Sequence, residues 1–307
     1  MAIGELSYVA LISRESAAAC EVFGRHLGLP RHDLAYGGQT LPVFSIGRAA
    51  LVVCPPEHPL VEGDANPGVH HIALATGDLR GAVDRLQAAG MRAGSQVAGL
   101  AGRAMCRIDR AATVGVRTVL TEPLAFPTHV GGPIERIDHL GVASSDVGED
   151  ERAYSRALGF EVESRQTDME VVMAVESFTS DKYGVVYHNR QPEPVGGLRV
   201  CFITIGDCEL EFLANFNPRQ GAEIKHGEPG TTRQDQGAIT RFVQSRGRGL
   251  HHLALKVADI NETLAKLAAA GLPMIDKVGR PGSRRALIGF SNPKALGGVL
   301  MHIVQRS

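Results

Sequence analysis

A short apolar strand recurs four times along the chain, and a stretch with helical periodicity follows each copy. The copies begin at Leu6 (LSYVAL), Val69 (VHHIAL), Ile137 (IDHLGV) and Leu250 (LHHLAL). Because internal similarity is the signature of repeated structural units, we expect four equivalent modules.

Helix signals are clearest after the second and fourth strands. Asp78 and Asp259 stand where an N-cap is expected, and Gly90 and Gly271 stand where a helix should end. Between these positions apolar residues keep the i, i+3, i+4, i+7 spacing of an amphipathic helix. They are Leu79, Ala82, Val83 and Leu86 in the first case and Ile260, Leu264 and Leu267 in the second.

Short β-type runs come after each helix, for example over residues 43–53, 200–213 and 297–304. Each unit therefore reads strand, helix and three further strands. The sequence predicts an α+β fold made of four βαβββ modules.

A stretch rich in Pro and Gly, Glu122 to Pro133, separates the first pair of modules from the second. We expect a first domain over residues 1–124, a linker over 125–134 and a second domain over 135–307. The third module also carries an extra segment over residues 166–197, for which a lid or a substrate wall is one interpretation.

One position of the repeated strand is polar in every copy. Aligning the four strands places Tyr8, His71, His139 and His252 at the same third position. Side chains at equivalent strand positions point to the same face of a sheet. The first half thus has one histidine on this face and the second half has two.

Two more polar groups appear only in the second half. The run IGDCELEFL aligns with IGRAALVVC and sets Glu211 against Val52. Near the chain end, GGVLMHIVQ places His302 among apolar residues, where the counterpart is Val119 or Leu120 depending on one gap. Four polar groups therefore converge in the second half alone.

Imidazoles with one carboxylate suit zinc, iron, manganese, cobalt or nickel. An unpaired carboxylate at an apolar strand centre costs several kcal/mol, whereas a metal offsets that cost. We predict one divalent metal ion per chain, of open identity, held by His139, Glu211, His252 and His302.

Other histidines and a cluster of arginines have structural interpretations that involve no metal. His70 and His251 alternate to the opposite strand face, where we expect them to pack beneath helices. The basic cluster of Arg280, Arg284 and Arg285 fits either a solvated hairpin or a site for an anionic substrate or phosphate.

Charge and composition narrow the partners. The 32 Lys and Arg nearly balance the 33 Asp and Glu, so no long-range field would attract nucleic acid or a membrane surface. No run of about eighteen apolar residues occurs, and the five cysteines form an odd set without a C-x-x-C pair. We expect a cytoplasmic protein with reduced thiols and a small-molecule carbonyl or aromatic substrate, and a homo-oligomer is compatible with the sequence.

The repeated strands and their polar residues resemble the vicinal oxygen chelate superfamily, which includes glyoxalase I, methylmalonyl-CoA epimerase, extradiol ring-cleaving dioxygenases and 4-hydroxyphenylpyruvate dioxygenase. The resemblance implies that paired modules form cupped sheets around a metal, giving two cupped-sheet domains here. The second half, from IDHLGVA through CELEFL and RGRGLHHLALKVADI to SNPKALGGVLMHIV, is most similar to methylmalonyl-CoA epimerase. In the family pattern His139, Glu211 and His252 fall on ligand positions, and His302 stands where the family has a glutamate.

Three functions follow from this resemblance. The first is a lyase, isomerase or epimerase that stabilises the enolate of a carbonyl or acyl-thioester substrate, with Glu211 and His302 as candidate catalytic residues. The alternative is an iron(II) ring-cleaving or 2-oxo-acid dioxygenase. A second alternative is a small-molecule binding protein that needs no metal. The missing glutamate of the last strand favours the first, non-redox function.

Overall fold

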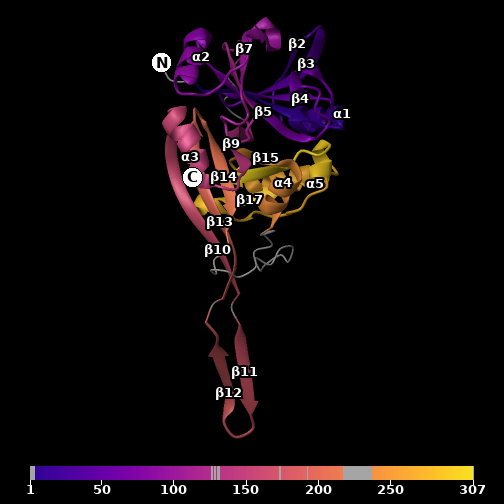
Figure 1. The fold of residues 1–307 in the computed structure, drawn as a ribbon. Coiled ribbons are helices and arrows are strands. Elements are labelled where there is room, and N and C mark those ends of the chain that lie inside the picture. Colours follow the sequence, from indigo (N-terminus) through magenta and orange to yellow (C-terminus); the bar gives the residue numbers. More distant parts are fainter. Residues whose placement is uncertain are drawn as a thin grey trace.

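The computed structural model describes residues 4–125, 127, 129, 132–172, 174–191, 193–216 and 237–306. Two eight-stranded sheets dominate it, one in each half of the chain (Figure 1). Their strand orders are β2-β3-β4-β1-β5-β8-β7-β6 and β10-β13-β14-β9-β15-β18-β17-β16, so the second sheet repeats the topology of the first. None of the helices described is long and apolar enough to cross a membrane.

The first half contains two βαβββ modules. Its elements are β1 (Leu6–Ile12), α1 (Ser16–Glu21), η1 (Val22–His26), β2 (Arg31–Tyr36), β3 (Gln39–Ile46), β4 (Ala49–Cys54), η2 (Pro59–Val61), β5 (Gly68–Ala75), α2 (Leu79–Ala88), β6 (Val97–Ala98), η3 (Leu100–Gly102), β7 (Ala104–Ile108) and β8 (Thr118–Thr121).

The second half repeats this pattern with insertions. Its elements are β9 (Ile134–Ala143), α3 (Val147–Glu151), η4 (Arg152–Ala157), β10 (Glu161–Val172), β11 (Val175–Ser180), β12 (Gly184–Asn189), β13 (Glu193–Ile205), β14 (Cys208–Asn215), α4 (Ala238–Arg246), β15 (Gly249–Val257), α5 (Ile260–Ala269), β16 (Arg280–Pro281), η5 (Ser283–Arg285), β17 (Leu287–Phe290), η6 (Pro293–Leu296) and β18 (Met301–Gln305). The predicted α+β fold of four βαβββ modules in two curled sheets is confirmed.

Local signals set the helix boundaries as predicted. The Asp78 carboxylate accepts a hydrogen bond from the Gly81 amide at 2.9 Å, and Asp259 caps α5 in the same way. Gly90 and Gly271 have φ values of +80° and +85°, a left-handed conformation that ends a helix at little cost for glycine.

Strand registers confirm the alignment of Glu211 with Val52. In the parallel pair β9–β14, Glu211 lies opposite Gly141. In the parallel pair β1–β4, Val52 lies opposite Ala10, which is the counterpart of Gly141 in the repeated strand.

The registers also decide the counterpart of His302. In the pair β15–β18, His302 lies opposite Ala254. In the pair β5–β8 the residue opposite Ala73 is Val119, and Ala73 corresponds to Ala254 in the repeated strand. Val119, and not Leu120, therefore occupies the equivalent place.

Apolar side chains fill the inner face of the first sheet. Tyr8 and Val52 are fully buried and Val119 is 4% exposed, and they belong to one cluster with residues such as Leu41 and Met105. The face that carries polar groups in the second half is thus a packed core in the first.

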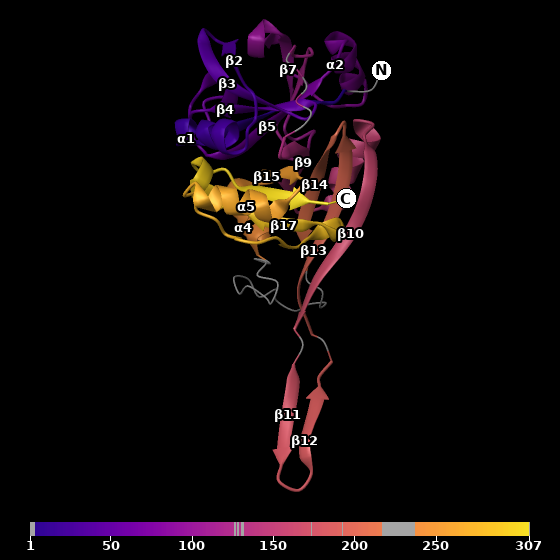
Figure 2. The same cartoon turned by 180° about the vertical axis from the view of Figure 1, so that it is seen from behind.

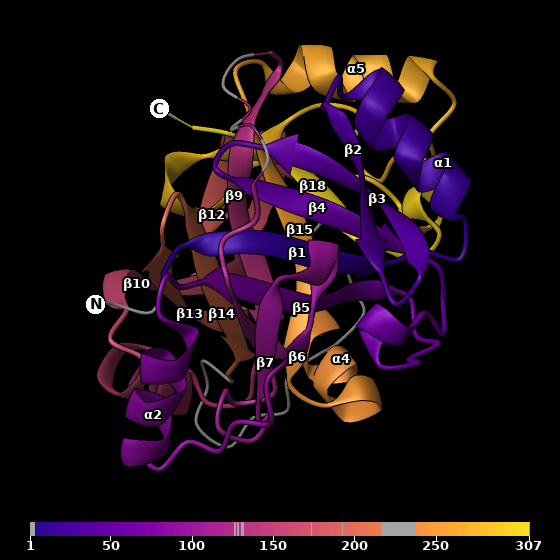
Figure 3. The same ribbon diagram turned by 90° about the horizontal axis from the view of Figure 1, so that it is seen from above.

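The two halves pack through β5 and β15, which lie side by side where they meet (Figure 3). One continuous core holds Val9 and Ile72 of the first half together with Leu140 and Leu253 of the second. The two sheets fall on either side of residues 125–134, so we keep the proposal of a linker there.

The extra segment of the third module is an arm. The long strands β10 and β13 leave the second sheet, and β11 and β12 form a separate two-stranded sheet beyond it (Figures 1 and 2). Phe178, Tyr183 and Tyr187 on this arm are 57%, 75% and 70% exposed. Because β11 and β12 lead away from both sheets, they form no lid over the polar groups of the second half.

Candidate metal centre

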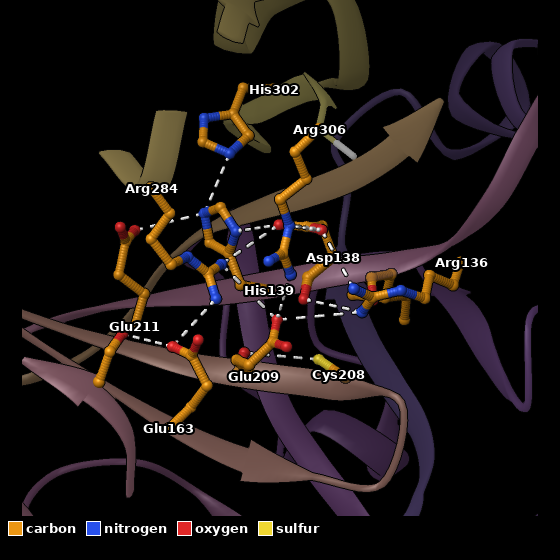
Figure 4. Close-up of polar contacts among 12 residues, drawn as sticks. Arg136, Asp138, His139, Glu163, Cys208, Glu209, Glu211, Arg284, His302 and Arg306 are labelled. Atoms are coloured by element: carbon orange, nitrogen blue, oxygen red, sulfur yellow. Dashed lines mark hydrogen bonds and ion pairs between the residues drawn. The ribbon is translucent and has the colours of Figure 1, made fainter. Parts of the chain in front are cut away.

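Four neighbouring strands of the second sheet each contribute one polar side chain to its inner face. They are His139 from β9, Glu211 from β14, His252 from β15 and His302 from β18. Each is between 4% and 6% exposed. Figure 4 shows His139 at the middle of this group, with His302 on one side and Asp138 on the other.

Their donor atoms lie close enough to share one ion. His139 Nε2 is 3.3 Å from Glu211 Oε2, 3.0 Å from His302 Nε2 and 3.5 Å from His252 Nε2. His252 Nε2 is 3.4 Å from Glu211 Oε2. Two donors that are each about 2.1 Å from one ion lie about 3.0 Å apart at a right angle and about 3.4 Å apart at the tetrahedral angle. The donor set therefore fits a divalent metal.

Glu211 and His302 occupy different sides of the group. Among the described residues, Glu211 makes ion pairs within 4.0 Å with His139 and His252, but none with His302. His139, His252 and Glu211 thus form a nearly equal-sided triangle, and His302 adjoins it through His139.

A buried carboxylate orients His139. The distance from His139 Nδ1 to Asp138 Oδ2 is 2.8 Å, and Asp138 has no exposed surface. Arg306 Nε donates to the same carboxylate at 2.9 Å. When Nδ1–H donates to a carboxylate, the lone pair of Nε2 is free for a metal, an arrangement common around metal-bound histidines.

Asp138 can reach His139 because β9 bulges at this point. Ala254 pairs with His139, and the next residue of β15 pairs with Ile137, so that Asp138 has no partner in the ladder. A bulge turns the extra residue away from strict alternation. The same applies to His251, the unpaired residue of β15 between Leu250 and His252.

Gly141 makes room for the second histidine. A Cβ atom at Gly141 would lie 2.0 Å from Cε1 of His252, so only glycine allows this ring to lie over β9. In the first half Ala10 stands at the equivalent position, and the His71 ring packs against Tyr8 with ring centroids 5.6 Å apart.

Comparisons with known proteins agree with this architecture. Residues 138–290 match the model of the glyoxalase/bleomycin resistance protein/dioxygenase superfamily. The chain belongs to this superfamily. The expected membership is thereby confirmed, and the donor set described above lies on the inner face of a superfamily sheet.

Two curated relatives each match part of the chain. The mitochondrial methylmalonyl-CoA epimerase of Dictyostelium discoideum is 21% identical over 203 residues, which cover 62% of this chain and 97% of that protein. The uncharacterized protein YqjC of Bacillus subtilis is 24% identical over 129 residues, covering 42% of this chain and 80% of its own. The predicted resemblance of the second half of the chain to methylmalonyl-CoA epimerase is confirmed.

The whole chain is also similar to solved structures. A mutant of 4-hydroxymandelate synthase from Streptomyces coelicolor superposes with a TM-score of 0.66 at 18% identity, covering 100% of this chain and 94% of that one. A fusion of a xylose isomerase-like TIM barrel with 4-hydroxyphenylpyruvate dioxygenase gives 0.56 at 16% identity, covering 100% of this chain and half of that one. At these identities the superpositions establish the fold.

The carboxylates around His139 favour its protonated form when no metal is bound. Burial alone would lower the pKa of His139, but the charges and hydrogen bonds of Glu211 and Asp138 raise it to about 9. Burial would raise the pKa of Glu211, but His139 and His252 hold it well below its usual range. The pKa of His302 is well below normal because of burial and the neighbouring imidazoles. A divalent ion would take the place of the His139 proton.

A small cavity of about 40 Å³ opens beside His139, Glu211 and His302. That volume holds a few waters or a small group of a substrate. Its other walls come from residues of several strands and of η5. They are Asp138, Phe202, Ser283, Arg284, Ala286, Ile288, Val304 and Arg306.

Of the predicted basic cluster, Arg284 reaches this cavity. Its guanidinium lies 3.7 Å from the centre of the Phe202 ring and 3.5 Å from the Asp138 carboxylate. Its φ of +54° is unusual for a residue with a side chain. Arg280 instead pairs with Asp276 at 3.3 Å.

Sequence reasoning missed the residues that support the donors. The pairing of Asp138 with His139 and of His251 with His252, whose Nδ1 atoms are 3.0 Å apart, depends on bulges that alternation does not predict. His251 does contact α4 as expected, with its ring centroid 4.9 Å from that of Phe242. The one available signal was an acidic residue directly before His139.

Proposed function

We propose that this chain is a metal-dependent enzyme in which His139, Glu211 and His252 hold one divalent ion. The triangle of donor atoms with sides of 3.3 to 3.5 Å supports the proposal. The buried Asp138 behind His139 adds to it, because such a carboxylate fixes the tautomer that a ligand requires. His302 is the fourth candidate ligand.

For the reaction we favour an iron(II) dioxygenase. Two histidines and one carboxylate on one face are the donor set of non-haem iron oxygenases, and bound iron(II) would supply chelation of substrate oxygens and activation of dioxygen. The sequence favoured a non-redox reaction because the last strand lacks its glutamate. In the structure Glu211 offers a carboxylate to the same two histidines from β14, so the missing glutamate no longer weighs against a dioxygenase.

Neither carboxylate of the cavity walls is free to act as the general base of a proton transfer, so His302 is the candidate base for that reaction. A lyase or epimerase needs a general base beside its substrate. Within the described part of the chain, the carboxylates that line the cavity are Asp138 and Glu211. Asp138 is engaged by His139 and Arg306, and Glu211 by the two histidines that share its oxygen.

The cavity suits one polar end of an anionic carbonyl or aromatic substrate, such as a carboxylate. Arg284 and Arg306 bring positive charge to its wall, and Ser283 adds a hydroxyl. The Phe202 ring offers an apolar surface beneath Arg284. A substrate carboxylate would meet the guanidinium groups while an adjacent carbonyl or hydroxyl oxygen of the substrate faces the donors. The buried Nδ1 of His302, which has no partner among the described residues, remains to hold a proton.

The first test is metal content and oxygen uptake. Protein purified without a chelating tag should hold one ion per chain, and the iron(II) form should consume oxygen with a 2-oxo acid or a catechol from a small panel. Glu211→Ala and His252→Ala should lose both the ion and oxygen uptake. Glu135→Ala, which removes an exposed carboxylate paired with Lys256, is the matched control and should behave like the parent. Full metal content in either ligand variant would contradict the donor set.

A second candidate is an epimerase or another isomerase, favoured by the match to nearly the whole length of a methylmalonyl-CoA epimerase. Exchange of an acidic C–H for deuterium without oxygen, suppressed in His302→Ala, would establish it in place of the dioxygenase. A metal-free binding protein is less well supported, because the burial of four polar donor groups would then have no ion to offset its cost.

A further inference from the structure

A cavity much larger than the one beside His302 lies between the two halves of the chain. Its volume is about 560 Å³, within the range of ligand pockets. It lies where β5 and β15 begin, and it shares no lining residue with the cavity beside His302. We call it the interdomain cleft.

Positive charge in this cleft exceeds negative charge. Arg110 and Arg117 line it from the first half and Arg246 lines it from α4, whereas its acidic residue is Asp64. Asp64 pairs with Arg117 at 2.9 Å. Among the described residues, the guanidinium groups of Arg110 and Arg246 therefore have no carboxylate of their own.

The two remaining arginines bond only to backbone oxygens within the described part of the chain. Arg110 donates to the carbonyl of Gly115 at 2.7 Å and to that of Arg248 at 2.8 Å. Arg246 donates to the carbonyl of Pro67 at 2.9 Å. These bonds aim the guanidinium groups but do not neutralise them. Burial and the nearby charge of Arg117 lower the pKa of Arg110, as expected where positive charges crowd together.

A buried imidazole in the cleft also lacks a partner. His70 is 4% exposed, and its Nε2 makes no hydrogen bond with any residue that the structure describes. Its Nδ1 lies 2.8 Å from Nδ1 of His71. A buried polar atom without a partner costs roughly 1–3 kcal/mol, and a ligand oxygen that accepts a hydrogen bond from Nε2 would offset that cost.

We propose that the interdomain cleft binds a small organic anion through Arg246 and Arg110, with an oxygen accepting from His70. Pro67, Val69 and Leu250 supply apolar walls for its carbon skeleton. Carboxylates and phosphates share the required chemistry, because guanidinium groups bind both through paired N–H donors. The cleft is a second site, separate from the metal centre.

Isothermal titration at constant ionic strength tests the proposal on the full chain. Inorganic phosphate and succinate are the two probes, and chloride is the salt control. Saturable binding of one phosphate or one succinate per chain is expected, and the tighter probe identifies the anion class. Heat that does not saturate with either probe, or that matches chloride, would overturn the proposal.

Variants locate the binding. Arg246→Gln and Arg110→Gln should each weaken the probe about tenfold or more, since a charge-assisted hydrogen bond is lost. Arg246→Lys keeps the charge and should retain most of the affinity. Arg103→Gln removes an exposed arginine outside the cleft and should change nothing. Equal affinity in Arg246→Gln, Arg110→Gln and the parent would show that the anion binds elsewhere, and metal content should stay at the parental value in all four.

Discussion

Replacing Gly141 by alanine should remove His252 from the metal centre while leaving the fold intact. The added Cβ would lie 2.0 Å from Cε1 of His252, whereas carbon atoms prefer about 3.5 Å or more. The ring must therefore retreat by about 1.5 Å. Metal–ligand distances tolerate only about 0.2 Å, so His252 can no longer act as a ligand.

The expected magnitude is large for metal binding and small for stability. Loss of an orienting partner alone weakens metal sites about 10- to 100-fold, and loss of a ligand should cost about 100-fold or more. The clash involves the end of a side chain that can rotate, so the metal-free protein should keep its circular dichroism spectrum. In the first half, Ala10 occupies the position equivalent to Gly141, and the His71 ring beside it packs against Tyr8.

Metal affinity is measured by competition titration of zinc against a chelator, and stability by thermal unfolding of the metal-free protein. Gly77→Ala is the matched control, because a Cβ there meets nothing within 4 Å. Metal affinity of Gly141→Ala within about threefold of the parent would refute the placement of His252.

Three further predictions follow from the same residues. Zinc affinity should rise about tenfold from pH 7 to pH 8 and level off above about pH 9, because the ion must displace one proton from His139. Glu211 and Asp138 outweigh the effect of burial there and raise the pKa of His139 to about 9. A pH-independent zinc affinity in titrations would contradict this. His71→Asn should leave one ion per chain in elemental analysis, since all of the proposed metal ligands lie in the second half. Leu253→Ala, at a fully buried position, should lower the free energy of unfolding by about 2–5 kcal/mol in urea titrations.

Much of this architecture could be predicted because its signals are local or repeated. The caps at Asp78 and Asp259 depend on hydrogen bonds within one turn. The equivalence of Glu211 and Val52 followed from aligning two similar runs, and the registers bear it out.

Contacts that depend on strand irregularities could not be predicted. Alternation assigned His251 to the face opposite the donors, and no prediction was made for Asp138. Bulges in β9 and β15 turn both residues toward their neighbouring histidines. The interdomain cleft depends on how two halves pack, and nothing near Arg110 in the sequence points to Arg246. Likewise, the sequence showed the length of the arm without showing that it leads away from the body.

The packed inner face of the first half also has an evolutionary consequence. Tyr8, Val52 and Val119 stand where the second half has His139, Glu211 and His302, and all three are buried in apolar surroundings. Reverting any one of them alone would bury an unpartnered polar group at a cost of roughly 1–3 kcal/mol, with no ion to repay it until the others changed too. A metal site in the first half would therefore need several concerted changes, because each single change costs stability.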